Sequence, residues 1–193
     1  MACCCMKMES LPVFDFSNPD RHAKANKLTK IMESVCFVYL DNVPRLATIR
    51  RWRPNFTRLL PGFFSKPLEE KIVVSPKNRS KDSPGVYRGY VPVNLDQSHL
   101  REQYEMGEVL PEDDPDRSSG NPLYKPTPWP NEDCPDVPYH QLMMSHYYAM
   151  LHAGMEFFHL TALGLGLDEH EFDDCFVPKS VSTLRIMHYP TYK

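Results

Sequence analysis

The sequence predicts a mixed α+β fold, and three patterns support this prediction. Two short apolar runs near the N-terminus enclose a segment with helical periodicity. A longer helical pattern occupies residues 140–167, and residues 182–190 then alternate as a β-strand does. With 193 residues, of which 41% are hydrophobic, the chain is long enough to bury a core.

The opening unit is predicted to be strand, helix, strand. Residues 11–16 form a short run typical of a strand, and residues 35–40 form a continuous apolar run suited to a buried strand. Between them, residues 19–34 carry apolar side chains at three- and four-residue spacing, which predicts a helix. We expect Ser17 or Asn18 to cap this helix.

The middle of the chain is predicted to hold a helix, a loop and an extended segment. Residues 46–64 suggest a second helix, whose arginines indicate either phosphate binding or solvated helix faces. Residues 75–85 are polar and rich in glycine and proline, which predicts a mobile loop. Residues 86–93 read as an extended segment, and residues 111–138 as a proline-rich surface connector.

Charge and cysteine content exclude several classes of protein. Positive and negative residues (22 and 25) are interspersed for a net charge of −3, so no overall field attracts nucleic acid or an acidic membrane. The apolar start at residues 1–6 is too short for a signal peptide or a membrane span. Six cysteines without a C-x-x-C pair indicate a reducing, cytoplasmic setting. Three of them, Cys3 to Cys5, lie in a tail that is either frayed or palmitoylated.

The helix predicted at residues 140–167 is the longest element, and Gly164 and Gly166 mark its end. Its expected buried stripe consists of Tyr147, Met150, Leu151, Phe158, Ala162 and Leu165. Three polar residues fall largely opposite this stripe, namely His152, Glu156 and His159. We interpret them as surface polarity, with an adventitious metal site as the alternative.

Several stretches resemble, in the same order, segments of one enzyme family. They are LPVFDFS (11–17), VCFVYLDN (35–42), FFSKPLEEK (63–71), YRGY (87–90), REQYEMGEVLPEDDP (101–115), PWP (128–130), LGLGLDE (163–169) and LRIMHYP (184–190). The family is the isopenicillin-N-synthase-like branch of the iron(II)/2-oxoglutarate-dependent dioxygenases, and the resemblance covers about residues 10–190. One local departure is Cys36, which stands with Phe37 where glycine normally precedes an aromatic pair.

The resemblance implies the N-terminal helical and strand layer of a double-stranded β-helix (jelly-roll) oxygenase, with most of the jelly roll missing. We accordingly predict a flexible Cys-rich tail at 1–9 and a non-haem dioxygenase N-terminal domain at 10–115. A Pro-rich connector would follow at 116–139, and the long helix with the first strand of the oxygenase core at 140–193.

The resemblance also implies iron(II) and 2-oxoglutarate as the cofactors of full-length family members. The family binds iron through a His-x-Asp pair and a distant second histidine, which follow the segment that matches HYP here. The chain ends at Lys193, and none of its eight histidines has Asp or Glu two residues later. We therefore expect no metal site, no bound cofactor and no catalytic residue in this chain.

Five residues are candidates for the substrate side of a site. By resemblance, Tyr189 aligns with a family tyrosine that points at substrate or co-substrate, and Arg185 lies on the same strand. Tyr87, Arg88 and Tyr90 align with a segment over the active-site mouth, where an arginine can hold a substrate carboxylate. The alternatives are that Tyr189 and Arg185 simply pack in a sheet and that Arg88 is a solvent-exposed loop residue.

The expected function is that of the N-terminal portion of an iron(II)/2-oxoglutarate-dependent oxidoreductase acting on an unknown small molecule, itself inactive. The alternative from another class is a catalytically dead binding or regulatory module, whose partner would cover strand 182–190. A third possibility is that two chains complete one another's core or that the remaining residues support a novel activity. Neither nucleic acid nor a membrane span is expected.

Overall fold

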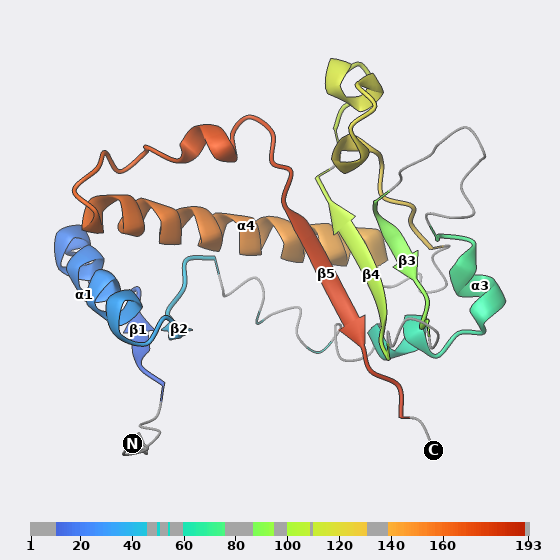
Figure 1. Cartoon of the computed structure of the whole chain (residues 1–193), viewed down its shortest axis with the longest axis horizontal. Coiled ribbons are helices and arrows are strands. Elements are labelled where there is room, and N and C mark those ends of the chain that lie inside the picture. The colour runs from blue at the N-terminus through green and yellow to red at the C-terminus, as the bar shows by residue number, and fades with distance from the viewer. Residues whose placement is uncertain are drawn as a thin grey trace, which may run out of the picture. The chain divides into compact units, whose positions relative to one another are not determined.

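The structure, a computed structural model, describes residues 11–45, 50, 54, 60–75, 87–94, 100–108, 110–130 and 139–191 (Figure 1). Two compact units make up the chain, one from Met1–Leu46 and His152–Asp174 and the other from Ala47–Leu151 and Cys175–Lys193. The predicted tail, most of the predicted helix 46–64 and nearly all of the predicted loop 75–85 lie outside the described residues.

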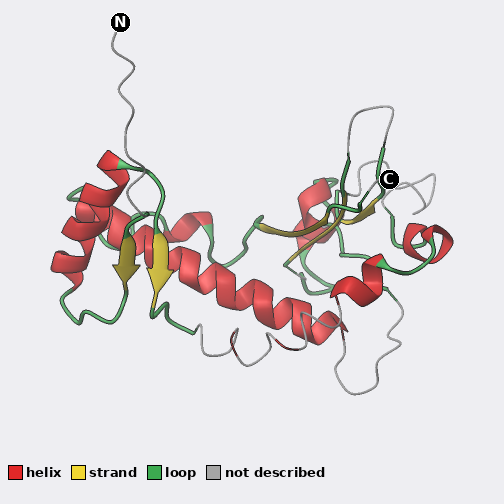
Figure 2. Ribbon diagram, turned by 90° about the horizontal axis from the view of Figure 1, so that it is seen from below, coloured by secondary structure: helices red, strands yellow, loops and turns green. Residues whose placement is uncertain are grey.

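The first unit opens with two parallel strands joined by a helix. β1 (Val13–Asp15) pairs with β2 (Tyr39–Asp41), and α1 (Arg21–Ser34) connects them; Figure 2 shows the strands side by side. The helix cap differs from the prediction. Asp20 is the N-cap, because its carboxylate accepts a hydrogen bond from the backbone N–H of Ala23. Asn18 instead accepts from the N–H of Asp20, so it shapes the turn before the helix.

The apolar run at 35–40 is not the buried strand that its composition predicts. Helix α1 ends at Ser34, and Cys36 then takes a positive φ of 61° that turns the chain out of the helix. The strand begins only at Tyr39, and Phe37 and Tyr39 are 69% and 62% exposed. The positive φ also explains why glycine is the usual residue at the position of Cys36 in the resembled pattern.

The core of the first unit combines residues far apart in sequence. Its buried members are Phe14, Phe16, Leu28, Val43, Ala153 and Leu160. The last two come from α4 (Tyr139–Gly164), which contributes to both units. Beyond α4, Gly166 has a φ of 76°, and the N–H groups of Gly166 and Leu167 bond to the carbonyls of Leu163 and Ala162. This cap confirms that the glycines end the helix.

The second unit contains a three-stranded antiparallel sheet in the order β3-β4-β5 (Figure 1). The strands are β3 (Gly89–Val91), β4 (Glu102–Gly107) and β5 (Thr183–His188). One face packs on the first half of α4 and on aromatic residues; the buried core is Phe63, Phe64, Val74, Tyr90, Tyr104, Met106, Tyr139, Leu142 and Met143.

Residues 60–64 are also helical. Shorter elements are α3 (Leu68–Ile72), the 3-10 turns η3 (Pro115–Ser118) and η4 (Pro122–Tyr124) in the proline-rich region, and η5 (Asp173–Cys175). In both η3 and η4 a proline opens the turn, where its missing N–H costs nothing. No helix among the described residues has the length and apolar content needed to cross a membrane.

The predicted buried stripe of the long helix is wrong in part. Tyr147 and Ala162 are buried, but Met150, Phe158 and Leu165 are exposed. The physical reason is that α4 serves two cores, one through residues such as Leu142 and the other through residues such as Leu160. A single stripe at the helical period cannot describe a helix whose two halves bury different residues. The mixed α+β fold itself is confirmed.

Candidate functional site

The sheet face opposite the core carries a group of polar side chains. Because side chains alternate along a strand, and Tyr104 and Met106 of β4 point into the core, Gln103 and Glu105 point to the other face. On β5, Arg185 lies directly across from Glu105 in the strand register. Polar residues of two neighbouring strands therefore meet on this face.

Glu105 and Arg185 form a cross-strand ion pair. The Arg185 Nε lies 2.6 Å from Glu105 Oε1, with Glu105 only 3% exposed at its side chain and Arg185 37%. Burial raises the pKa of the Glu105 carboxyl, and the charge and hydrogen bond of Arg185 oppose that shift. The carboxylate thus fixes the guanidinium plane of an arginine that still reaches solvent.

Two further residues extend this pair. Arg185 Nη2 donates to the hydroxyl of Tyr87 at 3.1 Å, and Gln103 Nε2 donates to Glu105 Oε1 at 2.8 Å. We call Tyr87, Gln103, Glu105 and Arg185 the Arg185 cluster. Glu105 contacts Nε and Tyr87 contacts Nη2 of the guanidinium, and Nη1 has no partner among the described residues. An arginine held on one side in this way can present its remaining donors to a carboxylate or carbonyl group.

The remaining sequence candidates do not join the Arg185 cluster. Tyr189 follows β5 and is exposed, with its hydroxyl 3.9 Å from the sulfur of Met187. Tyr90 is buried on the core side of the sheet, where its hydroxyl donates to Glu102 Oε2 at 2.5 Å. A substrate-side role for these two tyrosines stays a prediction.

Arg88 is 1% exposed, so the expectation of a solvent-exposed loop arginine is wrong. Its Nη1 donates to the carbonyl oxygens of Glu108 and Lys125, at 2.8 and 3.3 Å. Burial lowers the pKa of the guanidinium, and nearby Tyr147 and Glu108 act in the opposite direction. These contacts tie β3 to the segments that follow β4. Whether Arg88 also serves a substrate stays a prediction.

A second polar cluster lies on the core side and was missed by the sequence analysis. Lys71 Nζ lies 2.7 Å from Glu102 Oε2 and donates to the Phe64 carbonyl at 2.9 Å. His188 Nδ1 lies 2.7 Å from Glu102 Oε1. One signal could have revealed it: Glu102 shares the alternation of Tyr104 and Met106, so a charge in that register needs a buried partner.

The Arg185 cluster does not fit an iron(II) ion. The cluster holds no imidazole, and its single carboxylate is already paired, whereas the iron sites of such oxygenases use two imidazoles and one carboxylate. His188, also on β5, points to Glu102 on the core side instead. Iron ligands would have to come from other residues.

In the first unit, Glu156 and His159 are not the solvated surface residues that the sequence suggested. Both are partly buried: Glu156 accepts a hydrogen bond from Arg21, and His159 lies 2.6 Å from an oxygen of Asp173. The interpretation fails because α1 and the segment after α4 cover this face of the helix. Sequence periodicity alone could not show either contact.

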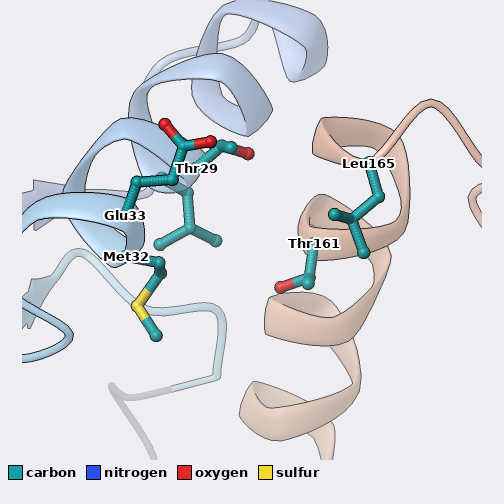
Figure 3. Close-up of a pocket in the computed structure, with 6 residues that line it drawn as sticks. Thr29, Met32, Glu33, Thr161 and Leu165 are labelled. Carbon is teal, nitrogen blue, oxygen red and sulfur yellow. The ribbon is translucent and has the colours of Figure 1, made fainter.

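A small cleft in the same unit lies between α1 and α4 (Figure 3). Its volume is about 240 Å³, and its lining consists of Leu28, Thr29, Met32, Glu33, Thr161 and Leu165. Three of these side chains are apolar and three are polar, among them the Glu33 carboxylate, and none is an imidazole or a guanidinium. The cleft lining has no cationic group, and the Arg185 cluster therefore remains the candidate site.

Comparison with known proteins now identifies the chain. A family described as the N-terminal part of non-haem dioxygenases in morphine synthesis matches residues 11–132, which is more than half of the sequence. The chain belongs to this dioxygenase family. The resemblance given by the sequence stretches is thus confirmed.

A curated relative is similar to more of the chain than the family match covers. A 2-oxoglutarate-Fe(II) type oxidoreductase, hxnY of Emericella nidulans, is 26% identical over 190 residues, which cover 93% of this chain and 52% of the relative. The chain therefore spans about half the length of the curated relative that it matches.

Solved structures agree. A C-terminally truncated Neurospora crassa protein in its apo form has a TM-score of 0.70 at 26% identity, covering 93% of this chain and 62% of that one. The same protein at full length, with α-ketoglutarate and thymine, gives 0.68 at 25% identity, with 93% and 55% covered. A putative 2OG-Fe(II) oxygenase of Caulobacter crescentus, at 24% identity and TM-score 0.73, shows the shared fold alone; 94% of this chain and 56% of that one are covered.

Proposed function

We propose that this chain forms the substrate-side, N-terminal part of an iron(II)/2-oxoglutarate-dependent oxidoreductase that acts on a small molecule. The observation behind the proposal is the Arg185 cluster, in which a buried carboxylate and a phenol hold a partly exposed guanidinium on the sheet face opposite the core. The relatives support the reaction class, since one is a 2-oxoglutarate-Fe(II) type oxidoreductase.

The role of the cluster is to bind and orient a substrate. Glu105 fixes the plane of the Arg185 guanidinium, and Nη1 donates to an acceptor oxygen on the substrate. Tyr189, exposed just after the same strand, supplies a second polar contact. The full-length Neurospora crassa protein has been solved in complex with thymine and with 5-formyluracil, which are small rings with carbonyl oxygens. A ring of that kind, with acceptor oxygens, is the substrate class that we propose.

Iron and 2-oxoglutarate bind outside the Arg185 cluster in this proposal. The donor groups of the cluster do not fit iron, so this part of the chain positions a substrate and supplies no oxidant. The chain's span of about half the length of hxnY supports the view that the oxidising centre belongs to further sequence. The chain by itself would then be inactive.

The first experiment measures the intact mass of the endogenous protein and its 2-oxoglutarate turnover. We expect a species well above 22.4 kDa that forms succinate, while the purified 193-residue chain with Fe(II), ascorbate and 2-oxoglutarate forms none. Succinate formation by the 193-residue chain alone would show that our assignment of the oxidising centre is wrong.

A second experiment tests Arg185 within the active protein. Arg185→Met should raise the substrate KM at least tenfold and leave substrate-independent 2-oxoglutarate turnover nearly unchanged. Arg117→Met is the matched control, because Arg117 lies in the same unit and its side chain donates to the carbonyl of Leu110, away from the cluster. If both substitutions changed the substrate KM equally, Arg185 would have no specific role in binding the substrate.

One observation favours a second function, that of a binding module. β5 is an edge strand, and among the described residues only β4 pairs with it. An alternating, half-exposed edge is a template for another strand. An endogenous mass of 22.4 kDa, together with a stoichiometric complex that protects β5 from hydrogen exchange, would favour this function over the first.

A further inference from the structure

Three metal-ligating side chains converge in the first unit. His159 Nε2 lies 2.6 Å from one oxygen of Asp173, and His170 Nδ1 lies 2.8 Å from the other. The ligand atoms of all three residues lie within 4.8 Å of one another. We propose that His159, His170 and Asp173 bind a divalent transition-metal ion of the Zn²⁺ or Co²⁺ type. From the sequence no metal site was predicted, with an adventitious one at His152, Glu156 and His159 as the alternative. The present inference does not depend on the proposed function.

The spacing of the three ligand atoms suits such an ion. Metal–nitrogen and metal–oxygen bonds of about 2.0–2.2 Å at tetrahedral angles put neighbouring ligand atoms roughly 3.3 Å apart. Two of the observed separations, 2.6 and 2.8 Å, are shorter than this value, and none of the three exceeds 4.8 Å. Small rotations of the carboxylate and the rings would admit the ion. Two imidazoles also favour zinc or cobalt over calcium or magnesium, which prefer oxygen ligands.

The segment that carries two of the ligands is held against the helix that carries the third. Gly166 turns the chain after α4 with a φ of 76°. Asp168 Oδ1 accepts a hydrogen bond from the N–H of His170, and Phe172 packs edge-on against Phe158 of α4, with ring centroids 6.0 Å apart. The site is thus assembled by contacts that do not involve the ligand atoms, so removing a ligand should leave it in shape.

A carboxylate lies near His159, one of the three proposed ligands. Glu156 Oε2 lies 3.8 Å from His159 Nδ1, the ring nitrogen that faces away from Asp173. Arg21 holds Glu156 through Nη1 at 2.8 Å and also pairs with Glu169. At 3.8 Å Glu156 makes no hydrogen bond to the ring, so its contribution is a negative charge beside His159.

The surroundings favour a cation, and the site would keep one open position. Residues 168–174 contain four acids besides Asp173, and Arg21 pairs with one of them, Glu169. Three protein ligands leave the fourth position of a tetrahedral ion for water or another small ligand. His170, at 65% side-chain exposure, gives the ion access from solvent.

The test uses tag-free protein with Cys3, Cys4 and Cys5 changed to Ser, because three adjacent thiols would bind metal on their own. Titration with CoCl₂ should give one equivalent of bound ion with visible d–d absorption and no near-UV thiolate band. Calorimetry with ZnCl₂ should give the same stoichiometry, and zinc should raise Tm.

Two ligand variants and a matched control decide the matter. His170→Gln and Asp173→Asn should each weaken cobalt binding at least tenfold, whereas His22→Gln, an exposed histidine of the same unit, should not. Unchanged circular dichroism of metal-free His170→Gln shows that the fold is kept. If cobalt binds equally to wild type and both ligand variants, binds with a thiolate band, or does not bind, the three residues make only a hydrogen-bonded contact and the proposal is wrong.

Discussion

A Cβ atom on Gly107 would overlap the guanidinium group of Arg88. The arginine is not free to withdraw, because it is buried and its Nη1 donates to the carbonyls of Glu108 and Lys125. β4 therefore needs glycine at its last position for a reason of space, and the need is set by the residue that immediately precedes β3.

Gly107→Ala should lower the free energy of unfolding by about 1–3 kcal/mol, because the methyl group displaces the guanidinium from its carbonyl partners. Urea denaturation measures the effect. Gly62→Ala is the control. Outside the local helix backbone, no atom of the described residues lies within 4 Å of a Cβ at this helical position, so alanine should be neutral or stabilising there. If the cause is the contact with Arg88, the loss should shrink in an Arg88→Met background; an unchanged loss would refute it.

Lys71→Met should destabilise the second unit by about 3 kcal/mol, because it leaves Glu102 buried without its main counter-charge. The matched control is Lys66→Met: its i,i+4 pair with Glu70 at 3.8 Å is partly exposed, so this substitution should cost clearly less than Lys71→Met. Chemical denaturation of both variants gives the comparison. Equal losses of unfolding free energy in the two variants would mean that the buried pair stabilises the protein no more than the partly exposed pair does.

The contributions of Glu102 and Glu105 to the stability of the fold should change with pH in opposite directions. For Glu102, burial raises the pKa, but hydrogen bonds from Lys71, Tyr90 and His188 outweigh it and the net shift is downward. Its contribution is therefore present above the ordinary Glu value of about 4.3 and lost as pH falls through the lowered folded pKa. The pKa of Glu105 is raised, so its contribution is present below about 4.3 and lost as pH rises through the folded value.

Unfolding free energies of Glu102→Gln and Glu105→Gln, measured from acidic to neutral pH, test this. Glu102→Gln should make stability rise less with pH than in wild type, and Glu105→Gln should make it rise more. Changes of slope with the same sign in both variants would contradict the assignment.

Gly164→Ala should destabilise the first unit by about 1–3 kcal/mol. A Cβ at Gly164 would overlap the hydroxyl of Thr29 and lie 3.2 Å from the Ala25 carbonyl, so the hydroxyl must leave its hydrogen bond to that carbonyl or the two helices must separate slightly. Gly154→Ala on the same helix meets no atom within 4 Å and should instead stabilise by up to about 1 kcal/mol. Thermal unfolding separates the two, and a destabilised Gly154→Ala would contradict the steric explanation.

Local sequence patterns correctly predicted the elements that are determined by residues close together in the sequence. The alternation at 182–190 became β5, and the glycines after the long helix became its cap. The pattern at 35–40 failed because the positive φ of Cys36 is set by the end of α1, which composition does not show. The helix stripe failed because α4 serves two cores.

The candidate site was predicted in part. Tyr87 and Arg185 were both singled out, and the structure joins them by a hydrogen bond although 98 positions separate them. Glu105, which fixes Arg185, was missed, because its role depends on the register between β4 and β5. Arg88 was expected at a mouth or in solvent, and its burial depends on carbonyls 20 and 37 positions away. Tertiary partners at such distances cannot be read from one sequence.

The division of the first unit between two distant stretches has a consequence during synthesis. Phe14 and Phe16 leave the ribosome early, but their partners Ala153 and Leu160 follow only after the intervening residues of the second unit have been made. At about 5–20 residues per second, the wait is roughly 5 to 30 seconds. During that interval the opening strand-helix-strand segment has an incomplete core, and a nascent-chain chaperone that binds aromatic side chains would find its target there.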